Sequence, residues 1–218
     1  MKYYLITLLT LALCLSACAA EPEPVPEPET APVMAPEPVP ARAPAEIPEP
    51  EGAEELFGYL SEKGYENPWF GFEAELEAAC YIGTVEEGAA IPAQGESVRV
   101  LSASGERGEW DITVTVSGAG AGATAEDYAA AMKTLAPAAY AKAELELTGS
   151  GIETLSFAGA EYPALRVAAE RRSERGDTLA VYQLTVFIKR GRYIAAVTAT
   201  TYIEDFTDSL IGGFYALA

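Results

Sequence analysis

Apolar and polar residues alternate with a period of two along several stretches of the chain, which predicts strands with one buried face. The alternation is clearest over residues 110–117, and residues 70–76 repeat it. Four later segments have the same strand character and follow each other closely: residues 152–157, 162–170, 178–189 and 192–201. Short turns that contain glycine join them, so we expect an antiparallel meander. Residues 181–188 are apolar on both faces, which favours a central strand.

Helical patterns occur between and after these strands. Thr124, followed by Glu126 and Asp127, predicts a capped helix N-terminus. We expect this helix to end at Pro137, with a second helical piece reaching about residue 145 and stopped by the glycines of residues 149–151. Residues 204–217 predict a final helix, which the pair Gly212-Gly213 weakens by about 1 kcal/mol per glycine.

The remaining segments are less regular. We expect a short amphipathic turn or helix over residues 53–60, a turn over 64–68, and a short strand over 78–85. Residues 86–108 are interpreted as an irregular excursion around a weak strand at 97–101, and the glycine-rich residues 118–122 as a connection. The sum predicts an α+β fold in which an antiparallel β-sheet is flanked by helices.

The first 18 residues have the pattern of a targeting segment. Lys2 provides a positive charge, and residues 3–13 are apolar apart from two threonines. This run is shorter than the roughly 20 residues that span a bilayer, but it suits a signal peptide. The segment Leu15-Ser16-Ala17-Cys18 resembles the lipobox of bacterial lipoproteins. The resemblance implies cleavage between Ala17 and Cys18 and attachment of a diacylglyceryl group to Cys18.

An ordinary secretory signal is the alternative, because residues 17–19 form an A-x-A pattern. Lipidation is favoured, since a cysteine at the end of such an apolar run is uncommon by chance. Two acyl chains hold a protein stably at a membrane, at about 0.8 kcal/mol for each buried methylene. We therefore expect residues 1–17 to be a lipoprotein signal peptide. The mature protein is expected to be exported and anchored through the lipid on Cys18 to the extracytoplasmic face of the membrane.

Residues 18–51 are interpreted as the lipidated cysteine and a disordered Pro/Glu-rich linker. Eleven of the fifteen prolines lie in residues 19–50, interleaved with glutamates. Proline favours extended backbone, so the tract predicts a semi-rigid spacer of about 3.1 Å per residue and on the order of 90 Å in all. A ligand for a proline-recognition domain is the alternative. Residues 52–218 then form a single α+β globular domain.

The formal net charge is −19, from 33 acidic and 14 basic residues. Residues 51–218 hold 26 acidic and 12 basic residues, so the domain alone carries −14. This field repels phosphate, and we expect no binding of nucleic acid and no electrostatic docking on anionic lipids. The excess of acid is interpreted as an aid to solubility, with binding of cations or of a basic partner as the alternative.

No histidine is present, which excludes histidine-dependent triads and histidine zinc sites. No phosphate-binding loop or calcium loop has the required spacing, so no cofactor and no metal site is predicted. With signal cleavage and lipidation, Cys80 remains the only free thiol, and no intramolecular disulfide can form. We expect Cys80 to pack as a small hydrophobic residue, the alternative being a reactive thiol.

Two other groups of residues can each be interpreted in two ways. The basic cluster Arg171-Arg172-Ser173-Glu174-Arg175 is interpreted as a solvated hairpin turn, or as a contact for an anion or a partner. Trp69, Phe70 and Phe72 are assigned to the core, although Trp69 beside Pro68 could line a rim.

Several segments resemble the PsbP-like fold, an αβα sandwich shared by photosystem PsbP, a Ran-binding Mog-type protein and envelope lipoproteins of the mycobacterial Lpq type. The similarity is carried by Tyr65–Phe72, by Thr124–Leu135, and by 159–164 with 182–183 and 191–194. It spans about 150 residues, and Ala79-Cys80-Tyr81 replaces the tryptophan usual after the first strand. Members of this family act mostly by binding or assembly, and no catalytic motif transfers to residues of this chain.

These features together predict a non-enzymatic envelope lipoprotein whose domain binds a partner protein or another ligand at the cell surface. The alternative is a surface hydrolase that uses carboxylates alone. That reaction needs two facing carboxyl groups about 5–10 Å apart in a cleft.

Overall fold

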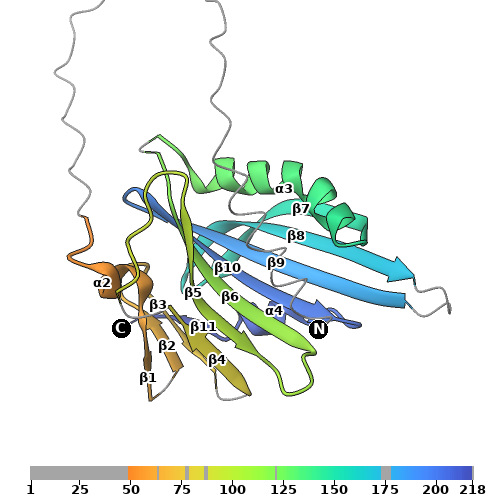
Figure 1. Cartoon of the computed structure of the whole chain (residues 1–218), viewed down its shortest axis with the longest axis horizontal. Coiled ribbons are helices and arrows are strands. Elements are labelled where there is room, and N and C mark those ends of the chain that lie inside the picture. Colours follow the sequence, from red (N-terminus) through yellow and green to blue (C-terminus); the bar gives the residue numbers. More distant parts are fainter. Residues whose placement is uncertain are drawn as a thin grey trace, which may run out of the picture.

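The computed structural model describes residues 49–62, 64–76, 79–85, 88–120, 122–172 and 178–217. The expected signal peptide, Cys18 and nearly all of the expected linker lie outside these residues. The described chain contains two antiparallel sheets and a few helices (Figure 1). This confirms the α+β class with mostly antiparallel strands. The helices are α2 (Ala53–Phe57), α3 (Ala125–Lys142) and α4 (Thr207–Ile211).

The larger sheet has seven strands in the order β4-β5-β6-β10-β9-β8-β7. Their bounds are β4 Tyr81–Thr84, β5 Ser97–Ser104, β6 Trp110–Gly118, β7 Glu146–Phe157, β8 Ala160–Arg172, β9 Thr178–Arg190 and β10 Tyr193–Tyr202. The predicted meander of the last four strands is therefore confirmed. Strand β9 pairs with β8 and β10, which is the central position that its apolar faces predicted.

The smaller sheet has four strands in the order β1-β2-β3-β11, and it joins the two ends of the described chain. Its strands are β1 Tyr59–Ser61, β2 Gly64–Asn67, β3 Phe72–Glu75 and β11 Phe214–Ala216. The turn predicted over residues 64–68 is wrong, because residues 64–67 form β2. The turn follows it instead: the Asn67 side chain accepts a hydrogen bond from the Phe70 amide at 2.9 Å and donates to Leu56 O at 3.2 Å.

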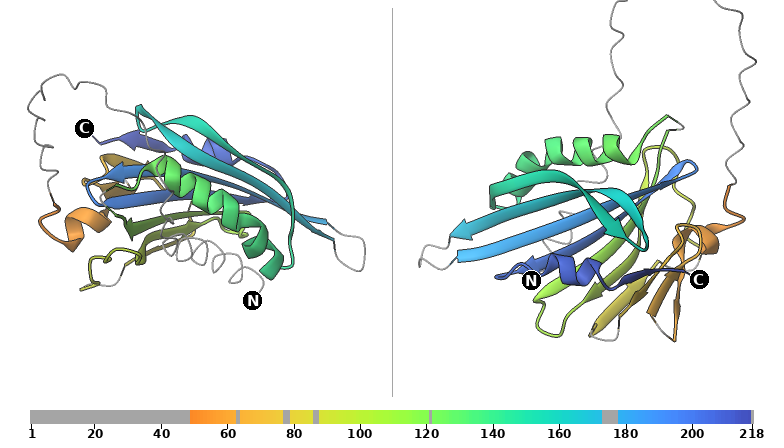
Figure 2. Two further views of the ribbon diagram at one scale, coloured as in Figure 1. Left: turned by 90° about the horizontal axis from the view of Figure 1, so that it is seen from above. Right: turned by 180° about the vertical axis from the view of Figure 1, so that it is seen from behind.

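The layers correct the expected αβα sandwich (Figure 2). Helix α3 packs over β7, β8 and β9 on one face of the large sheet. The small sheet, with α2 and α4, covers the other face, so that layer is mainly β-structure rather than helix. The main hydrophobic core lies between the two sheets and includes Tyr65, Phe72, Val114, Leu184 and Val197. Trp69, Phe70 and Phe72 all belong to this core, as predicted.

Helix α3 begins as its sequence predicts and ends later. Thr124 and Asp127 form a reciprocal capping box, with the Asp127 amide donating to Thr124 Oγ1 at 3.1 Å. The predicted break at Pro137 is wrong, because the helix continues through it to Lys142. Met132 and Tyr140 are buried on either side of the proline, so packing on the sheet holds both halves in line.

The segment after α3 is a strand rather than a helix terminus. Residues 149–151, expected to end a helical piece, lie within the edge strand β7. Glu144, with φ of 60°, already reverses the chain behind the helix. A register shift between Leu147 and Gly149 accommodates the glycine-rich stretch in the sheet.

The predicted final helix over 204–217 is wrong beyond its first turns. Helix α4 ends at Ile211, Gly212-Gly213 follow, and β11 pairs with β3. Phe214 lies against Phe72 and Phe157, with ring centroids 5.7 Å and 5.2 Å away. Burial of this ring in the core stabilises a strand where local spacing favours a helix.

Three expectations about strands near the N-terminal part also change. Residues 59–61 form β1 after α2 instead of extending the helix, and Leu60 is 45% exposed rather than packed with Leu56. Strand β5 is longer than the weak segment predicted within 86–108. Strand β6 is buried on both faces, because Thr113 and Thr115 are 4% and 3% exposed. Alternation of threonine with apolar residues predicted that one face of this strand would contact solvent, but the threonine side chains are buried as well.

Candidate binding surface on the small sheet

The residues that the sequence singled out as candidate sites do not come together in one place in the structure. Ala17 and Cys18 lie outside the described residues, so lipidation and signal cleavage stay predictions. Arg171 forms an ion pair with Glu144 at 3.5 Å, while residues 173–177 of the same turn are not described. Cys80 is an exposed free thiol. Its expected packing as a buried hydrophobic residue is wrong, because it precedes β4, a sheet edge where Tyr81 is 60% exposed.

A row of four side chains crosses the outward face of the small sheet. The strand register places Tyr59 opposite Glu66, Glu66 opposite Glu73, and Glu73 opposite Tyr215. Directly opposed residues share a face of a sheet. The adjacent row of Tyr65, Ala74 and Phe214 points into the core instead. We call Tyr59, Glu66, Glu73 and Tyr215 the Tyr–Glu row.

The two tyrosines of this row are unusually exposed. Tyr59 and Tyr215 have 47% and 46% of their surface accessible. The Tyr59 hydroxyl donates to Glu66 Oε2 at 2.9 Å. This hydrogen bond, together with the charge of Glu66, raises the pKa of the Tyr59 hydroxyl. The phenol therefore remains a neutral donor that holds the carboxylate in place.

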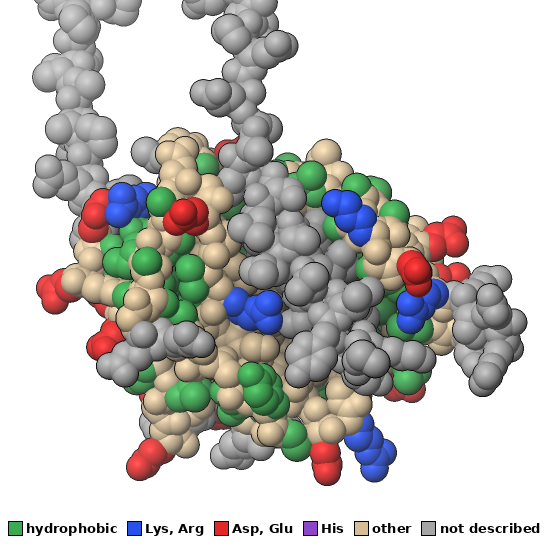
Figure 3. All heavy atoms as spheres, in the orientation of Figure 1, with side chains coloured by type: hydrophobic (Ala, Val, Ile, Leu, Met, Phe, Trp, Pro, Cys, Tyr) green, Lys and Arg blue, Asp and Glu red, His purple; other side chains and the backbone are tan. Residues whose placement is uncertain are grey.

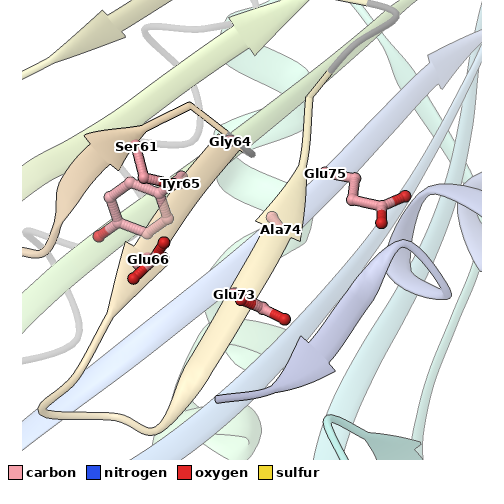
Figure 4. A pocket seen from close by; sticks show the side chains of 7 residues that line it. All are labelled: Ser61, Gly64, Tyr65, Glu66, Glu73, Ala74 and Glu75. Atoms are coloured by element: carbon pink, nitrogen blue, oxygen red, sulfur yellow. The ribbon is translucent and has the colours of Figure 1, made fainter. Parts of the chain in front are cut away.

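Beside the row lies a small hollow where β2 and β3 run together (Figure 4). Its lining includes Ser61, Gly64, Glu66, Glu73 and Glu75. Its volume is about 30 Å³, which suits a water molecule or the tip of a side chain rather than a substrate. Gly64 makes the hollow possible, because a Cβ there would lie 2.0 Å from Ala74 O. Glu73 and Glu75 extend from the same face of β3, which adds a third carboxylate.

The electrostatics of this surface favour a positively charged partner. Opposed like charges in neighbouring strands repel each other, and a cationic group placed between them removes the repulsion. Exposed tyrosine rings add a face that attracts lysine or arginine. The chain as a whole has the same sign, with a formal net charge of −19, and acidic side chains are spread over the view in Figure 3 together with basic ones.

A second hollow is lined by several carboxylates and therefore bears on the alternative hypothesis of a carboxylate-dependent hydrolase. It measures about 350 Å³, is open to solvent, and its lining includes Glu126, Glu153 and Glu161. Glu153 is neutralised there by Arg166, at 2.9 Å. Burial raises the pKa of the Asp111 carboxyl, the property of a general acid, but β6 lies three strands from β8 in the sheet. Hence Asp111 does not form a facing acid–base pair with Glu153 or Glu161.

Two general searches of the described residues bear on other classes of site. No group of three or more Cys, Asp or Glu side chains in this part of the chain is arranged to hold a metal ion. No helix among the described elements has the length and apolar character needed to cross a membrane.

The Tyr–Glu row could not be found from the sequence. Glu66 falls in a segment that was predicted to be a turn, and Tyr215 falls in a predicted helix. Only the alternation in residues 70–76 placed Glu73 on a solvent face. The row exists because β11 pairs with β3, a contact between residues about 140 positions apart.

Comparison with known proteins gives only distant likenesses. No protein-family model matches the sequence, and no curated protein matches it. The solution structure of cyanobacterial PsbP (CyanoP) from Synechocystis sp. PCC 6803 is similar, with a TM-score of 0.43 and 14% identity; the match covers 76% of this chain and 96% of that one. LpqN of Mycobacterium tuberculosis, described as involved in cell envelope biogenesis, gives a TM-score of 0.36 and 13% identity over 63% and 91% of the two chains. With TM-scores below 0.5, neither likeness assigns this chain to a family or a function.

Proposed function

We propose that this chain is an envelope lipoprotein without catalytic activity, whose PsbP-like domain binds a basic partner protein through the Tyr–Glu row. The observation that carries the binding role is the row itself. It places two carboxylates between two exposed tyrosines on one sheet face. Lysine and arginine side chains of a partner would form charge-assisted hydrogen bonds with the carboxylates and stack on the rings.

The anchoring part of the proposal rests on residues 1–18. The lipobox-like segment ends at Cys18, and the Pro/Glu tract follows directly. Such an anchor and spacer would hold the domain away from the membrane, at the extracytoplasmic side, where a partner can approach the small sheet.

Lipidation is tested by fractionating bacterial cells that express the full chain. We expect the protein in the membrane fraction and acyl chains on Cys18 by mass spectrometry. Cys18→Ser should move it out of that fraction. A soluble wild-type protein without acyl chains would show that the anchoring proposal is wrong.

Binding is tested by pull-down from native membranes with the mature chain as bait. We expect Glu66→Lys/Glu73→Lys to reduce capture of the partner at least tenfold, because it reverses the charge at the centre of the row. Glu146→Lys/Glu161→Lys changes two exposed glutamates on β7 and β8, so it is the charge-matched control and should capture normally. Equal capture by both variants would locate binding elsewhere on the molecule.

A further inference from the structure

One long edge of the large sheet has a strand on one side only. Strand β7 stands at the end of the strand order, and in the described part of the chain only β8 pairs with it (Figure 2). Residues 148–154 of this strand are all exposed. Every second residue of an edge strand directs its backbone N–H and C=O away from the sheet, so β7 offers a row of donors and acceptors that another strand can bind.

Strand β7 has little of the protection that edge strands usually carry. Lysine, proline or a bulge commonly prevents an edge from pairing with another chain. The bulge of β7 lies between Leu147 and Gly149, so the strand is regular from Gly149 to Phe157. Its sequence contains no lysine, arginine or proline. Glu153 is the one charged residue of the regular part, and Arg166 of β8 pairs with it at 2.9 Å.

Two glycines in the middle of β7 are not required by the fold of one copy. A Cβ at Gly149 or Gly151 would meet nothing within 4 Å, and neither residue has a positive φ. Glycine weakens a strand, and it often marks a place where another backbone approaches closely. The apolar side chain of Ile152, next to these glycines, is 42% exposed. A second strand at this edge accounts for both features.

Symmetry and charge limit the ways in which two copies of β7 can pair. In an antiparallel pair related by a two-fold axis, the residue at the axis faces its own copy. With Glu153 at the axis, two carboxylates would oppose each other. With Gly151 at the axis, Glu153 faces Gly149 of the partner subunit, and no two glutamates of β7 are opposed. This register also makes Ile152 a diagonal neighbour of Ile152 of the partner subunit.

We propose that two copies of this chain pair edge to edge along β7, antiparallel and with Gly151 at the two-fold axis. The two large sheets then form one continuous sheet, and the outward backbone groups of both copies are hydrogen-bonded. Because this axis is perpendicular to the sheet, both small sheets lie on the same side, and the dimer presents two Tyr–Glu rows in the same direction. The pairing requires neither lipidation nor the partner proposed above.

Sedimentation velocity of the unlipidated mature chain tests the pairing. The protein is residues 18–218 with Cys18→Ser, and a reducing agent keeps Cys80 from linking two copies. We expect a dimer whose fraction rises with protein concentration. Each domain carries a net charge of −14, so repulsion opposes association, and salt at about 0.5 M should increase the dimer fraction. A chain that stays monomeric at every concentration and at high salt would overturn the proposal.

A lysine at the edge should separate the copies. Ile152→Lys should raise the dissociation constant by about tenfold, because two like charges replace an apolar contact beside the axis. Ile82→Lys is the matched control, since Ile82 is a 36% exposed isoleucine on β4, the opposite edge of the same sheet. It should leave the dimer unchanged. Hydrogen exchange should show slower exchange of residues 148–154 in the dimer than in Ile152→Lys, with the amides of the central strand β9 alike in both.

Two substitutions at Gly149 test the register. Gly149→Glu places a carboxylate opposite Glu153 of the partner subunit and should weaken the dimer, whereas Gly149→Lys should strengthen it. Thr84→Glu and Thr84→Lys make the same changes of net charge at an exposed position of β4. The contrast between the two variants should therefore be larger at Gly149 than at Thr84. Equal contrasts would show that Gly149 does not face Glu153, and the register would be wrong.

Pairing of β7 with β4 of a further copy is a different way of joining two edges. It is a head-to-tail contact, so it would produce chains of copies that grow beyond the dimer. Ile82→Lys would then reduce association as strongly as Ile152→Lys does. That result would overturn the two-fold pairing.

Discussion

At the scale of single residues, the strongest constraint on residue type occurs where the neighbouring backbone leaves no space for a side chain. Gly64 opens β2 with φ of 141°, and a Cβ there would lie 2.0 Å from Ala74 O and 3.2 Å from the Leu76 amide nitrogen. Both obstacles are backbone atoms of the neighbouring strand, which cannot move without breaking the sheet. By contrast, Gly71 has φ of 75° but nothing within 4 Å of its Cβ position.

We expect Gly64→Ala to lower the free energy of unfolding by about 2–3 kcal/mol, because both backbone strain and a steric clash arise. Gly71→Ala is the matched control and should cost about 1 kcal/mol, from strain alone. Urea denaturation of the two variants measures the difference. Equal losses would show that the contact with Ala74 is relieved by a shift of the strand.

A second residue-scale effect is the titration of Asp111. Burial raises the pKa of its carboxyl above the ordinary value of 3.8, although the Tyr202 hydroxyl donates to it at 2.7 Å and opposes the shift. The folded protein therefore binds this proton more tightly than the unfolded chain does. As the pH rises from 3.8 through the folded pKa, ionisation of Asp111 lowers the stability of the fold.

Comparison with Asp111→Asn isolates this effect, because the amide oxygen still accepts from Tyr202 but does not titrate. The wild type should be most stable relative to the variant at low pH, and the difference should fall as the pH rises above 3.8 and then level off. Unfolding by urea at a series of pH values tests this. A difference that does not depend on pH would contradict the raised pKa.

At the scale of elements, α3 is attached to the sheet by polar as well as apolar contacts. The Tyr140 hydroxyl donates to Gln183 Oε1 at 3.0 Å, and Gln183 Nε2 donates to Thr200 Oγ1 at 3.1 Å. Tyr140 and Gln183 are 1% and 4% exposed, so water cannot replace a lost partner easily. This chain of hydrogen bonds fixes the helix over the central strand β9.

Tyr140→Phe should lower the free energy of unfolding by about 1–3 kcal/mol, because it leaves the buried oxygen of Gln183 without a donor. The double variant with Gln183→Met removes both partners, and its cost should be smaller than the sum of the two single costs. Chemical denaturation of the four proteins completes the cycle. Additive costs would show that the two side chains do not interact energetically.

Other elements are joined by charge. Arg166 of β8 donates to both carboxylate oxygens of Asp208 in α4, at 2.8 Å and 3.1 Å, and also pairs with Glu153 of β7. The bidentate geometry holds the short helix α4 against the sheet before the chain turns into β11. Local propensity does not determine this position, since α4 has only five residues.

At the scale of the whole molecule, two hydrophobic cores stabilise the part of the chain that the structure describes. One core lies between the sheets and the other under α3. Among the described residues, Cys80 is a free thiol on the surface beside the edge strand β4. Neither core uses it.

We therefore expect reducing agents to leave the midpoint of thermal unfolding of the mature chain unchanged. Cys80→Ser should alter the free energy of unfolding by less than about 0.5 kcal/mol, as exposed substitutions usually do. A thiol reagent should react with Cys80 in the native protein under conditions where the fold is intact. Reaction only after denaturant is added would mean that the thiol is covered in solution.

The amino-acid sequence determined what depends on neighbouring residues. The four-strand meander, the capping box at Thr124 and the inward side chains of residues 70–76 are all encoded by periodicity, turns and caps, and all are present in the structure. The expected anchor at Cys18 and the domain limits are also statements about local patterns, and they stay predictions.

Tertiary structure decided what depends on distant residues. The small sheet unites segments from both ends of the described chain, so β2 replaces a predicted turn and β11 replaces the end of a predicted helix. Packing on the large sheet carries α3 through Pro137, and the sheet edge exposes Cys80. The Tyr–Glu row and the contact of Glu49 with Arg192 arise in the same way. Burial of rings such as Phe214 in a shared core outweighs local preferences that differ by only about 1 kcal/mol per residue.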